Sequence, residues 1–520
     1  MPFGGSVAAG ESIHRYHRRG GDPGDGLRDA LAGGAPSPEV AIIGGGAGGL
    51  AMAIQLKLAG CNTFTLFEKS DGVGGTWRDN SYPGSGCDVP SHLYSFSFAS
   101  KADWTRKFPE QAEILDYFES LVPRFELGPH LRLETEITEV TWSEETGRWT
   151  LTTAVGDRHE ADVVVSGLGQ LNRPYVPDIP GLSEFEGTTF HSARWDHDHD
   201  LRGERIGVIG IGASAIQFVP RIAREARQLT LFQRSANYVG PKRDRAFHRF
   251  EKLAFTHLPF LQRAYRQWIY WRYEARFSLF KKDSRLGAYF QRMFTKLLQP
   301  MIETGDLTTE ALVPDYPPGC RRILTASDWY PTLMQPHVSV VTEGVDKIGT
   351  RSIVTTDGVE HPVDTIVFGT GFATTEFLAP MKVTGRQGAD LNEVWGGAAR
   401  AYLGMSIPQF PNFFMLYGPN TNLGHNSILF MIEQQVAYTL SMLELIARRR
   451  LKAVDVTEVA MERYDEEIQR MAGDTVWAEG CHSWYKNSDG RITNNWVSYT
   501  VDYRKRLSKV DLHDWKLEPV

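Results

Sequence analysis

The chain has 520 residues, of which 42% are hydrophobic and 23% are charged, and its 63 acidic and 56 basic residues give a net charge of −7. This length exceeds the size at which a single core stops growing, so we expect two or three domains with room for a large buried cofactor. The acidic balance argues against nucleic acid as the main partner. No stretch approaches the about 18 apolar residues of a membrane span, so stable membrane insertion is not expected.

The N-terminal segment, residues 1–37, is rich in Gly, Arg and Asp and lacks apolar periodicity. This composition predicts a mobile arm that precedes the first folded domain.

The first folded unit opens with an apolar strand over residues 40–43. This strand runs directly into Gly44, Gly46 and Gly49, spaced G-x-G-x-x-G, and a helical pattern follows. Such glycines permit a tight turn and bring a pyrophosphate close to the N-terminus of the helix. A second strand ends at Glu68, whose carboxylate is placed to accept hydrogen bonds from ribose hydroxyls. The unit therefore predicts a dinucleotide site.

A second copy of this pattern follows another apolar strand later in the chain. Its glycines are Gly210 and Gly212, and Ser214 and Ala215 complete the motif, with Ala at the place of the third glycine. A single glycine string can be a simple turn. Two strings in the same strand-to-helix context indicate two dinucleotide sites.

The two units differ in charge at one equivalent position. Glu68 lies 24 positions after Gly44 (68 − 44), and Arg234, followed by Ser235, lies 24 positions after Gly210 (234 − 210). A carboxylate suits a free ribose, whereas Arg can bind the 2′-phosphate of NADP with two hydrogen bonds. We therefore expect NADPH in the second unit and FAD in the first.

Two further apolar strands, DVVVSGLG at 162–169 and DTIVFGTG at 364–371, both end in G-x-G and are expected to close the two units. The predicted fold is α/β, with two Rossmann-like dinucleotide-binding domains and a helical insertion in the NADP domain. We expect FAD-domain segments at 38–175 and 366–520 and the NADP domain at 176–365.

The helical insertion, residues 246–298, interleaves aromatic and basic residues at helical spacing. Such a stripe can bind a membrane surface or stack on nucleic acid. It is more often the core face of a helix pair, and this is the interpretation that we favour. Further on, Asn426 or Ser427 is expected to begin a long helix.

The four cysteines, Cys61, Cys87, Cys320 and Cys481, are widely spaced and form no C-x-x-C pair. The spacing suggests neither a disulfide framework nor a metal site, and it fits a cytoplasmic location. These features do not specify an oligomeric state.

Residues 185–196, FEGTTFHSARWD, lie between the two units and are interpreted as an interdomain linker. They read F-x-G-x-x-x-H-x-x-x-W-D, the fingerprint of the type I Baeyer-Villiger monooxygenases among the class B flavin-dependent monooxygenases. The chain resembles this family over nearly its whole length. The matching residues are Phe185, Gly187, His191, Trp195 and Asp196. The resemblance implies that His191 couples the domains rather than performs chemistry.

The resemblance also implies residues around the flavin. The segment GVGGTW, with Gly75, Thr76 and Trp77, resembles the one that wraps the FAD phosphates and isoalloxazine, and Tyr94 belongs to the block that follows. Asp88 of that block is implied to orient a catalytic arginine. An isolated Asp in a loop can alternatively cap a turn.

The catalytic arginine is implied to be Arg322, in the segment GCRR. Arg321 corresponds to a basic residue that contacts the 2′-phosphate of NADP, although two adjacent arginines can also form a solvated pair. Trp484, in the sequence SWY, is implied to pack at the NADP ribose. The run that follows it, KNSDGRITNNW, departs from the family pattern and leaves the role of Trp484 open.

The resemblance implies a monooxygenase that uses NADPH and O2 to convert a small-molecule ketone to an ester or lactone through a C4a-peroxyflavin, with sulfoxidation as a side activity. One alternative is a flavin monooxygenase that acts mainly on nitrogen or sulfur, in which Phe or Tyr usually replaces Trp195. Another is a flavin reductase or flavin-binding sensor without oxygenation. The lack of a redox cysteine pair argues against a disulfide reductase.

Overall fold

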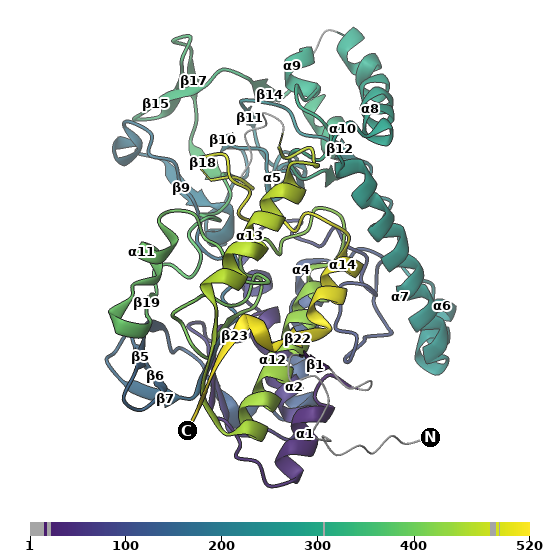
Figure 1. Cartoon of the computed structure of the whole chain (residues 1–520). Coiled ribbons are helices and arrows are strands. Elements are labelled where there is room, and N and C mark those ends of the chain that lie inside the picture. The colour runs from purple at the N-terminus through teal and green to yellow at the C-terminus, as the bar shows by residue number, and fades with distance from the viewer. Residues whose placement is uncertain (1–14, 18–21, 305–306, 479–484, 488) are drawn as a thin grey trace.

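The computed structural model describes residues 15–17, 22–304, 307–478, 485–487 and 489–520 (Figure 1). None of the described helices is both long and apolar enough to cross a membrane. The helices are α1 (Asp25–Ala32), α2 (Ala47–Leu58), α3 (Thr76–Asp79), α4 (Gln111–Arg124), α5 (Ala215–Ile222), α6 (Arg249–His257), α7 (Pro259–Glu274), α8 (Arg285–Glu303), α9 (Thr309–Leu312), α10 (Trp329–Leu333), α11 (Leu391–Trp395), α12 (Ile428–Arg449), α13 (Glu458–Ala472) and α14 (Thr500–Leu507).

Two parallel five-stranded sheets form the centre of the protein. The first has the order β20-β8-β2-β3-β4 and the second the order β9-β18-β10-β11-β14. In each sheet the strand before the glycine motif, β2 or β10, lies between the next strand and the strand that ends in G-x-G. The strands of the first sheet are β2 (Val40–Ile43), β3 (Phe64–Phe67), β4 (Leu131–Arg132), β8 (Val163–Ser166) and β20 (Phe413–Met415); those of the second are β9 (Thr188–His191), β10 (Arg205–Ile209), β11 (Gln228–Phe232), β14 (Val338–Val341) and β18 (Thr365–Phe368). The predicted α/β fold with two Rossmann-like units is confirmed.

Smaller sheets surround these two. One joins β19 (Lys382–Thr384), β5 (Ile137–Ser143), β6 (Arg148–Thr153) and β7 (Arg158–Ala161), and another joins β15 (Val345–Gly349), β16 (Ser352–Thr355) and β17 (Glu360–Pro362). Strand pairs are formed by β1 (Arg15–His17) with β22 (Lys509–Asp511), β12 (Val239–Gly240) with β13 (Leu324–Thr325), and β21 (Leu451–Val456) with β23 (Trp515–Pro519).

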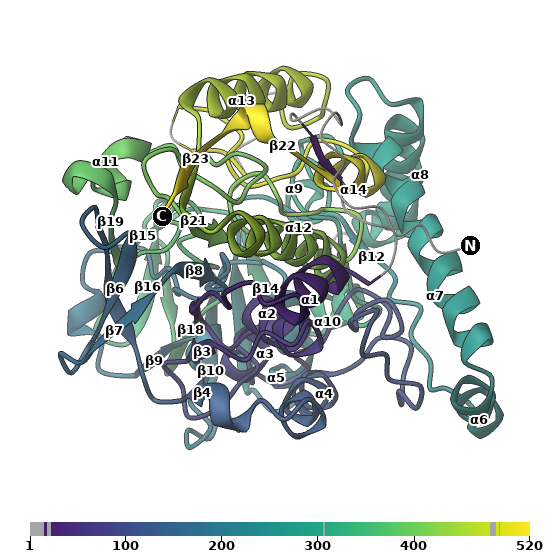
Figure 2. The same cartoon turned by 60° about the horizontal axis from the view of Figure 1, so that its bottom comes forward.

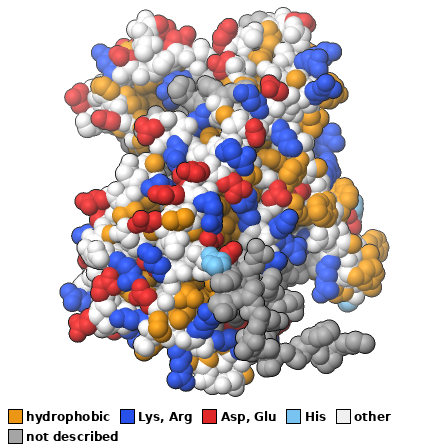
Figure 3. Space-filling view, viewed as in Figure 1, with side chains coloured by type: hydrophobic (Ala, Val, Ile, Leu, Met, Phe, Trp, Pro, Cys, Tyr) orange, Lys and Arg blue, Asp and Glu red, His pale blue; other side chains and the backbone are white. Residues whose placement is uncertain are grey.

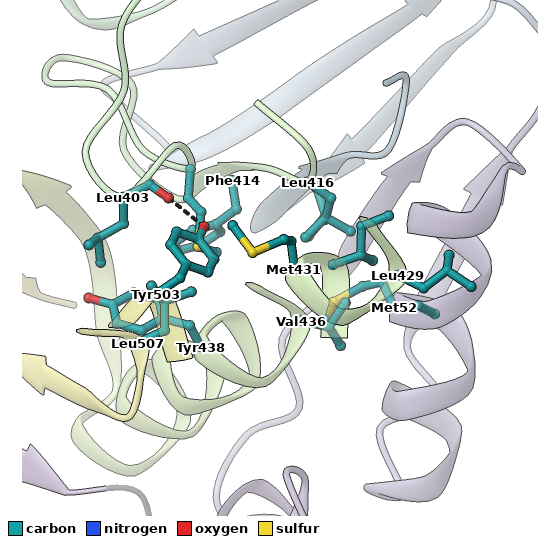
Figure 4. Packing of buried hydrophobic residues seen from close by; sticks show 14 of the residues in the cluster. Met52, Leu403, Phe414, Leu416, Leu429, Met431, Val436, Tyr438, Tyr503 and Leu507 are labelled. Atoms are coloured by element: carbon teal, nitrogen blue, oxygen red, sulfur yellow. Dashed lines mark hydrogen bonds between the residues drawn. The ribbon is translucent and has the colours of Figure 1, made fainter. Parts of the chain in front are cut away.

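The main core is built around α12, which packs on α2 and α14 (Figures 2 and 4). Met52 of α2 and Met431 of α12 are both fully buried. Tyr503 of α14 is also buried, and its hydroxyl donates a hydrogen bond to the carbonyl of Leu403 (2.7 Å), so the polar end of this large side chain is satisfied. Burial of each such side chain stabilises the fold by about 1.5–3 kcal/mol. The core thus fixes the first sheet to the C-terminal helices.

The second sheet includes the G-x-G strand at 364–371, as its motif predicts, and therefore extends past the expected domain boundary. β18 pairs with β10 and β9, so the chain remains in the second unit through this strand and returns to the first unit only afterwards. The return therefore comes later than the expected boundary at residue 366. The reason is that β18 holds in the second sheet the place that β8 holds in the first.

The fingerprint segment, predicted to be an interdomain linker, is partly built into the second sheet. Residues 188–191 form β9, an edge strand of the second sheet that pairs in parallel with β18. A β-carbon on Gly187 would lie 2.2 Å from the carbonyl oxygen of Asp364, so only glycine allows this close approach to the start of β18. The sequence did not predict this strand because it is short and lies at an edge of the sheet, where the alternation of apolar and polar residues is weak.

The expectation of a mobile arm through residue 37 is also wrong for its C-terminal half. Helix α1 packs on α12, and Leu27 is 1% exposed in the main core. Arg448 of α12 donates a hydrogen bond to the carbonyl of Gly26 (3.1 Å). One buried leucine and two small residues on one face are enough to dock a short helix, although they give little periodicity in the sequence.

This docking predicts that Leu27→Ala destabilises the protein by about 2–4 kcal/mol, because it leaves a cavity in the main core. Urea unfolding measured by circular dichroism would detect the loss. Leu58→Ala, at a leucine that is 42% exposed, is the matched control and is expected to have little effect. Equal midpoints for Leu27→Ala and wild type would show that α1 does not contribute to the folded core.

Candidate active site

The two glycine motifs adopt the same backbone geometry. Gly44 has φ +100° and Gly210 has φ +101°, a region that favours glycine. A β-carbon on Gly44 would lie 3.0 Å from the carbonyl oxygen of Gly167, and one on Gly210 would lie 2.6 Å from that of Gly369. The turn after the first strand therefore packs against the G-x-G turn of the neighbouring strand in both units.

A cavity of about 500 Å³ lies where the first unit meets the second. Its wall includes ten of the predicted site residues: Gly44, Gly46, Glu68, Gly75, Thr76, Trp77, Asp88 and Tyr94 from the first unit, and Ser214 and Arg322 from the second. Among the described residues, the wall does not include Gly49, Gly210, Gly212, Ala215, Arg234, Ser235 or Arg321. The cavity thus gathers the predicted flavin contacts and the proposed catalytic pair in one place.

Gly49 lies beneath the first glycine loop rather than in the cavity. A β-carbon at this position would come within 1.9 Å of the carbonyl oxygen of Gly44. Its role is therefore to let α2 pack closely under the loop.

The carboxylate of Glu68 supports the loop from the end of β3. One oxygen accepts a hydrogen bond from the backbone N–H of Gly45 (2.5 Å), and the other accepts one from that of Ser70 (2.9 Å). A carboxylate has about four acceptor positions, so two remain for another partner on the cavity side. The predicted contact with a ribose is compatible with this arrangement.

The structure brings Arg322 and Asp88 together across the junction of the units. Nη2 of Arg322 donates to both carboxylate oxygens of Asp88 at 2.8 Å, and Nε donates to one of them at 3.1 Å. In the described part of the chain, Nη1 of Arg322 has no hydrogen-bond partner. This nitrogen is therefore available to a bound molecule in the cavity.

The same pair controls the ionisation of both groups. Burial opposes the charge of Asp88, but the nearby guanidinium of Arg322 outweighs it and lowers the pKa of the carboxyl. The charge of Asp88 in turn raises the pKa of Arg322, against the effect of burial. The site therefore holds a fixed ion pair at neutral pH, and the Arg322 side chain keeps its charge.

The wall beside this pair is strained. Tyr417 has φ +60°, which is uncommon for a residue other than glycine and often marks a functional site. Its backbone N–H donates to Gln435 of α12 (2.9 Å) and its hydroxyl donates to Asn422 (2.7 Å). These contacts hold the tyrosine in the cavity wall.

Gln217 was not predicted from the sequence, although it joins the two units at the cavity. It lies on α5 of the second unit, and its Oε1 accepts a hydrogen bond from the hydroxyl of Tyr82 (2.9 Å). Its Nε2 donates to the carbonyl of Gly86 (2.9 Å). A polar residue within the apolar run AIQFVP is the signal that could have indicated it.

The start of α12 at the cavity is held by a buried carboxylate of α7. Glu274 is 2% exposed and accepts hydrogen bonds from Asn426 and Thr500, both at 2.8 Å. Asn426 lies in the cavity wall. Ser427 is the N-cap residue of α12, as the sequence suggested, although its side chain makes no capping hydrogen bond. The insertion therefore helps to position one edge of the cavity, a role that the sequence did not reveal.

A basic cluster lies in the second unit. Nη1 of Arg321 donates to the hydroxyl of Ser235 (2.6 Å), and its guanidinium lies over the ring of Tyr316 (4.6 Å to the centroid). Arg234 directly precedes Ser235 in the chain and is exposed. The structure thus brings the Arg321 side chain to the end of β11, where the motif predicts the ribose phosphate. Trp484 lies outside the described residues.

Cys320, directly before these arginines, is disulfide-bonded, whereas Cys61 and Cys87 are free and buried. The cysteine spacing gave no indication of a disulfide at this position, because pairing depends on the distance between side chains in space.

The aromatic residues of the fingerprint pack inside the second unit. Trp195 lies between Phe190 of β9 (5.0 Å between ring centroids) and Phe218 of α5 (5.3 Å). His191 is buried, and its Nδ1 accepts a hydrogen bond from the backbone N–H of Ala193 (3.1 Å). Burial lowers the pKa of His191 to about 4. The histidine is therefore a neutral structural residue near neutral pH.

Parallel sheets with matched glycine turns, together with one cavity that both units line, define a class of proteins that bind two dinucleotides. The chain belongs to the flavin-binding monooxygenase-like family, whose model matches residues 37–381. It is 42% identical to a Baeyer-Villiger monooxygenase of Pseudomonas aeruginosa over 92% of this chain and 91% of that protein. A Baeyer-Villiger monooxygenase of Streptomyces coelicolor is also 42% identical, over 92% of each chain.

Solved structures agree with this assignment. An oxidized steroid monooxygenase bound to NADP superposes with a TM-score of 0.81 at 29% identity, covering 93% of this chain and 100% of the other. Cyclohexanone monooxygenase from Rhodococcus sp. Phi1, bound to NADP+, gives a TM-score of 0.79 at 27% identity and covers 93% and 99% of the two chains. The resemblance inferred from the motifs is confirmed.

The burial of His191 predicts a pH-dependent contribution to stability. Its pKa is lower in the folded protein than in the unfolded chain, so the unfolded chain binds more protons between about pH 6.5 and 4. The contribution is present above pH 6.5 and is lost as the pH falls through this window. His191→Asn retains an acceptor for Ala193 but does not titrate, so wild type should lose about 1–3 kcal/mol more than the variant between pH 7 and 4.5.

Urea unfolding at several pH values would measure this difference. Other buried histidines contribute equally to both proteins, so the difference reports on position 191 alone. Parallel pH profiles for the two proteins would contradict a buried neutral histidine.

Proposed function

We propose that this protein is an NADPH- and O2-dependent flavin monooxygenase that inserts oxygen beside the carbonyl of a small-molecule ketone. The observation that carries the proposal is the Arg322–Asp88 pair, which presents a permanent positive charge in a cavity between two dinucleotide-binding units. The names of the relatives and the fingerprint at Trp195 support Baeyer-Villiger oxidation over a reaction confined to nitrogen or sulfur.

The described residues fit FAD in the first unit. A β-carbon on Gly75 would lie 2.9 Å from the Cα of Gly46, so these two glycines keep a narrow cradle open beside the N-terminus of α2. The helix terminus and its N–H groups favour a pyrophosphate at this place. Thr76 and Trp77 continue the wall. We assign FAD to this cradle, with Glu68 toward its ribose and Tyr94 and Asp88 toward its ring system.

The second unit fits NADPH. Gly210 and Gly212 would receive the pyrophosphate, while Arg234, Arg321 and Ser235 would receive the 2′-phosphate. Two guanidinium groups and a hydroxyl can donate charge-assisted hydrogen bonds to the doubly charged 2′-phosphate of NADPH. The free ribose hydroxyl of NADH is uncharged and accepts such bonds less well.

When bound, FAD and NADPH would supply the electrons that activate O2, the source of the oxygen atom that is inserted into the substrate. The task of the protein is then to hold the ketone beside that oxygen and to stabilise negative charge on the carbonyl oxygen as the new bond forms. Arg322 supplies this stabilisation, because no described residue accepts a hydrogen bond from its Nη1 and Asp88 fixes its orientation before the reaction.

Asp88 acts by positioning Arg322. Its two oxygens bind Nε and Nη2, and this leaves one defined direction for Nη1. The charge of Asp88 also raises the pKa of this half-buried arginine and so favours its charged form. A fixed charge in a cavity shielded from water stabilises a developing oxyanion more than a solvated one does.

Replacement of Arg322 tests this role. Arg322→Ala is expected to lower the rate of ester formation by at least about 10²-fold, the cost of removing a preorganised oxyanion donor. Arg322→Lys keeps the charge but not the two-point contact with Asp88, so we expect partial activity. The measurement is mass spectrometry of products from heavy-isotope O2, NADPH and a probe with both a ketone and a thioether.

One labelled oxygen beside the carbonyl would establish the proposed reaction in the wild type. Labelled sulfoxide alone would contradict it and favour the heteroatom reaction. Ester formation by Arg322→Ala at the wild-type rate would show that another group stabilises the oxyanion.

The basic cluster predicts the choice of nicotinamide cofactor. Arg234→Ala should raise KM for NADPH about 10-fold, the effect of losing one charge-assisted hydrogen bond, and leave KM for NADH within about 2-fold. Steady-state oxidation followed at the nicotinamide absorbance gives both values. Arg224→Ala, at another exposed arginine of the second unit, is the matched control. Equal changes in KM for NADPH and NADH would show that Arg234 does not bind the 2′-phosphate.

We expect the enzyme in the cytoplasm, where NADPH is available to it. Cell fractionation with activity measurements would test this location.

A further inference from the structure

We propose that the outer side of α6, α7 and α8 is a docking surface for an anionic lipid bilayer. We call it the insert face, and it consists of the exposed side chains of residues 249–298. This proposal concerns where the protein binds and stands independently of the proposed reaction.

Helix α7 exposes an apolar stripe although its opposite side is buried. Phe260, Trp268 and Trp271 are 63%, 53% and 57% exposed, and their spacing of 8 and 3 positions places them on one side of the helix. Ile269 and Tyr270 are buried in the main core. The sequence prediction that the aromatic stripe is a core face therefore holds for the buried side of α7 but not for Phe260, Trp268 and Trp271. No described residue covers these three exposed side chains.

The helices on either side of α7 continue this apolar surface. Phe250 of α6 is 83% exposed, and Leu253 is exposed one turn later. On α8, Tyr289, Met293 and Leu297 recur every four residues and are all exposed. Large exposed apolar side chains therefore recur on all three helices. A gathering of such side chains on a surface marks an interaction site.

The same segment has a charge opposite to that of the rest of the chain. Residues 246–298 contain 11 Lys and Arg and 3 Asp and Glu, a net charge of +8, whereas the whole chain has −7, so the remainder has −15. Of the three acids, Glu274 is buried and Glu251 is paired with Arg245. Figure 3 shows basic and hydrophobic side chains mixed along the edge formed by these helices. The insert face is thus strongly cationic.

This combination fits the surface of an anionic bilayer. Interfacial helices expose Trp, Phe and Leu to the boundary of the acyl chains and place Lys and Arg at the level of the phosphates. On α7 the apolar stripe is flanked by the exposed Arg263 and Arg272, and Arg272 lies over the ring of Trp268 (5.3 Å). Their long side chains can reach the headgroups while the aromatic rings enter the interface.

The charge also argues against the other occupants of an apolar face. A symmetric pair of chains joined through the insert face would bring two +8 surfaces together. Nucleic acid would stack on the aromatic rings but would not cover Leu253, Met293 and Leu297, and the remainder of the chain would repel it.

Vesicle sedimentation with the full chain tests the proposal. We expect the protein to sediment with vesicles of equal parts phosphatidylglycerol and phosphatidylcholine and to stay in solution with phosphatidylcholine alone. High salt should weaken the binding, because the charges are screened. The triple variant F260S/W268S/W271S and the double variant R263E/R272E should each lose at least about 10-fold in affinity, the first through lost burial and the second through lost attraction.

The control variant V155S/V459S removes two valines that are 85% and 71% exposed outside the insert face, and it should bind vesicles as wild type does. Circular dichroism of all variants verifies that they are folded. Wild-type protein that remains in solution with the anionic vesicles would overturn the proposal. So would equal vesicle binding by wild type and both insert variants, or a wild-type dimer in sedimentation velocity that the triple variant converts to monomers.

Discussion

The contact between Arg322 and Asp88 joins the two nucleotide-binding units at the wall of the cavity. Each residue comes from a different unit, and the guanidinium is held through two of its three nitrogens by both carboxylate oxygens. Both side chains are half-buried, and the pair fixes the direction of the guanidinium only while the two units remain in register. Gln217 and Tyr82 reinforce that register a short distance away. The chemistry of the site and the packing of the domains therefore depend on the same few contacts.

The two units on either side of this contact share the same turn geometry. In both units a glycine with φ near +100° turns the chain after the central strand and packs against the carbonyl of the neighbouring G-x-G turn. The first unit closes its sheet with β20 and the second with β9. The fingerprint thus occupies a structural position, since its glycine, histidine and tryptophan attach this edge strand to β18 and α5. The helical insertion has two faces, one that fixes the start of α12 through Glu274 and one that is exposed and basic.

Several elements could be predicted from the sequence because they obey local rules. The glycine spacing, the charges at Glu68 and Arg234 and the two G-x-G strands all follow from short segments, and the structure arranges the strands as expected. The pairing of Arg322 with Asp88 came from the family resemblance and is confirmed as a contact. The errors concern weak local signals: β9 is four residues long, α1 docks through few apolar side chains, and the disulfide of Cys320 depends on proximity in space.

The sequence by itself determined the α/β class and the two dinucleotide motifs, because backbone geometry near a phosphate demands glycine at fixed intervals. The positions of the catalytic candidates followed from the family resemblance of their segments. Only the tertiary structure decided which aromatic residues of the insertion are buried and which are exposed. It also decided that Nη1 of Arg322 has no hydrogen-bond partner among the described residues and that Gln217 and Glu274 hold the cavity wall. These features arise from contacts between residues 130 or more positions apart, and no local pattern encodes them.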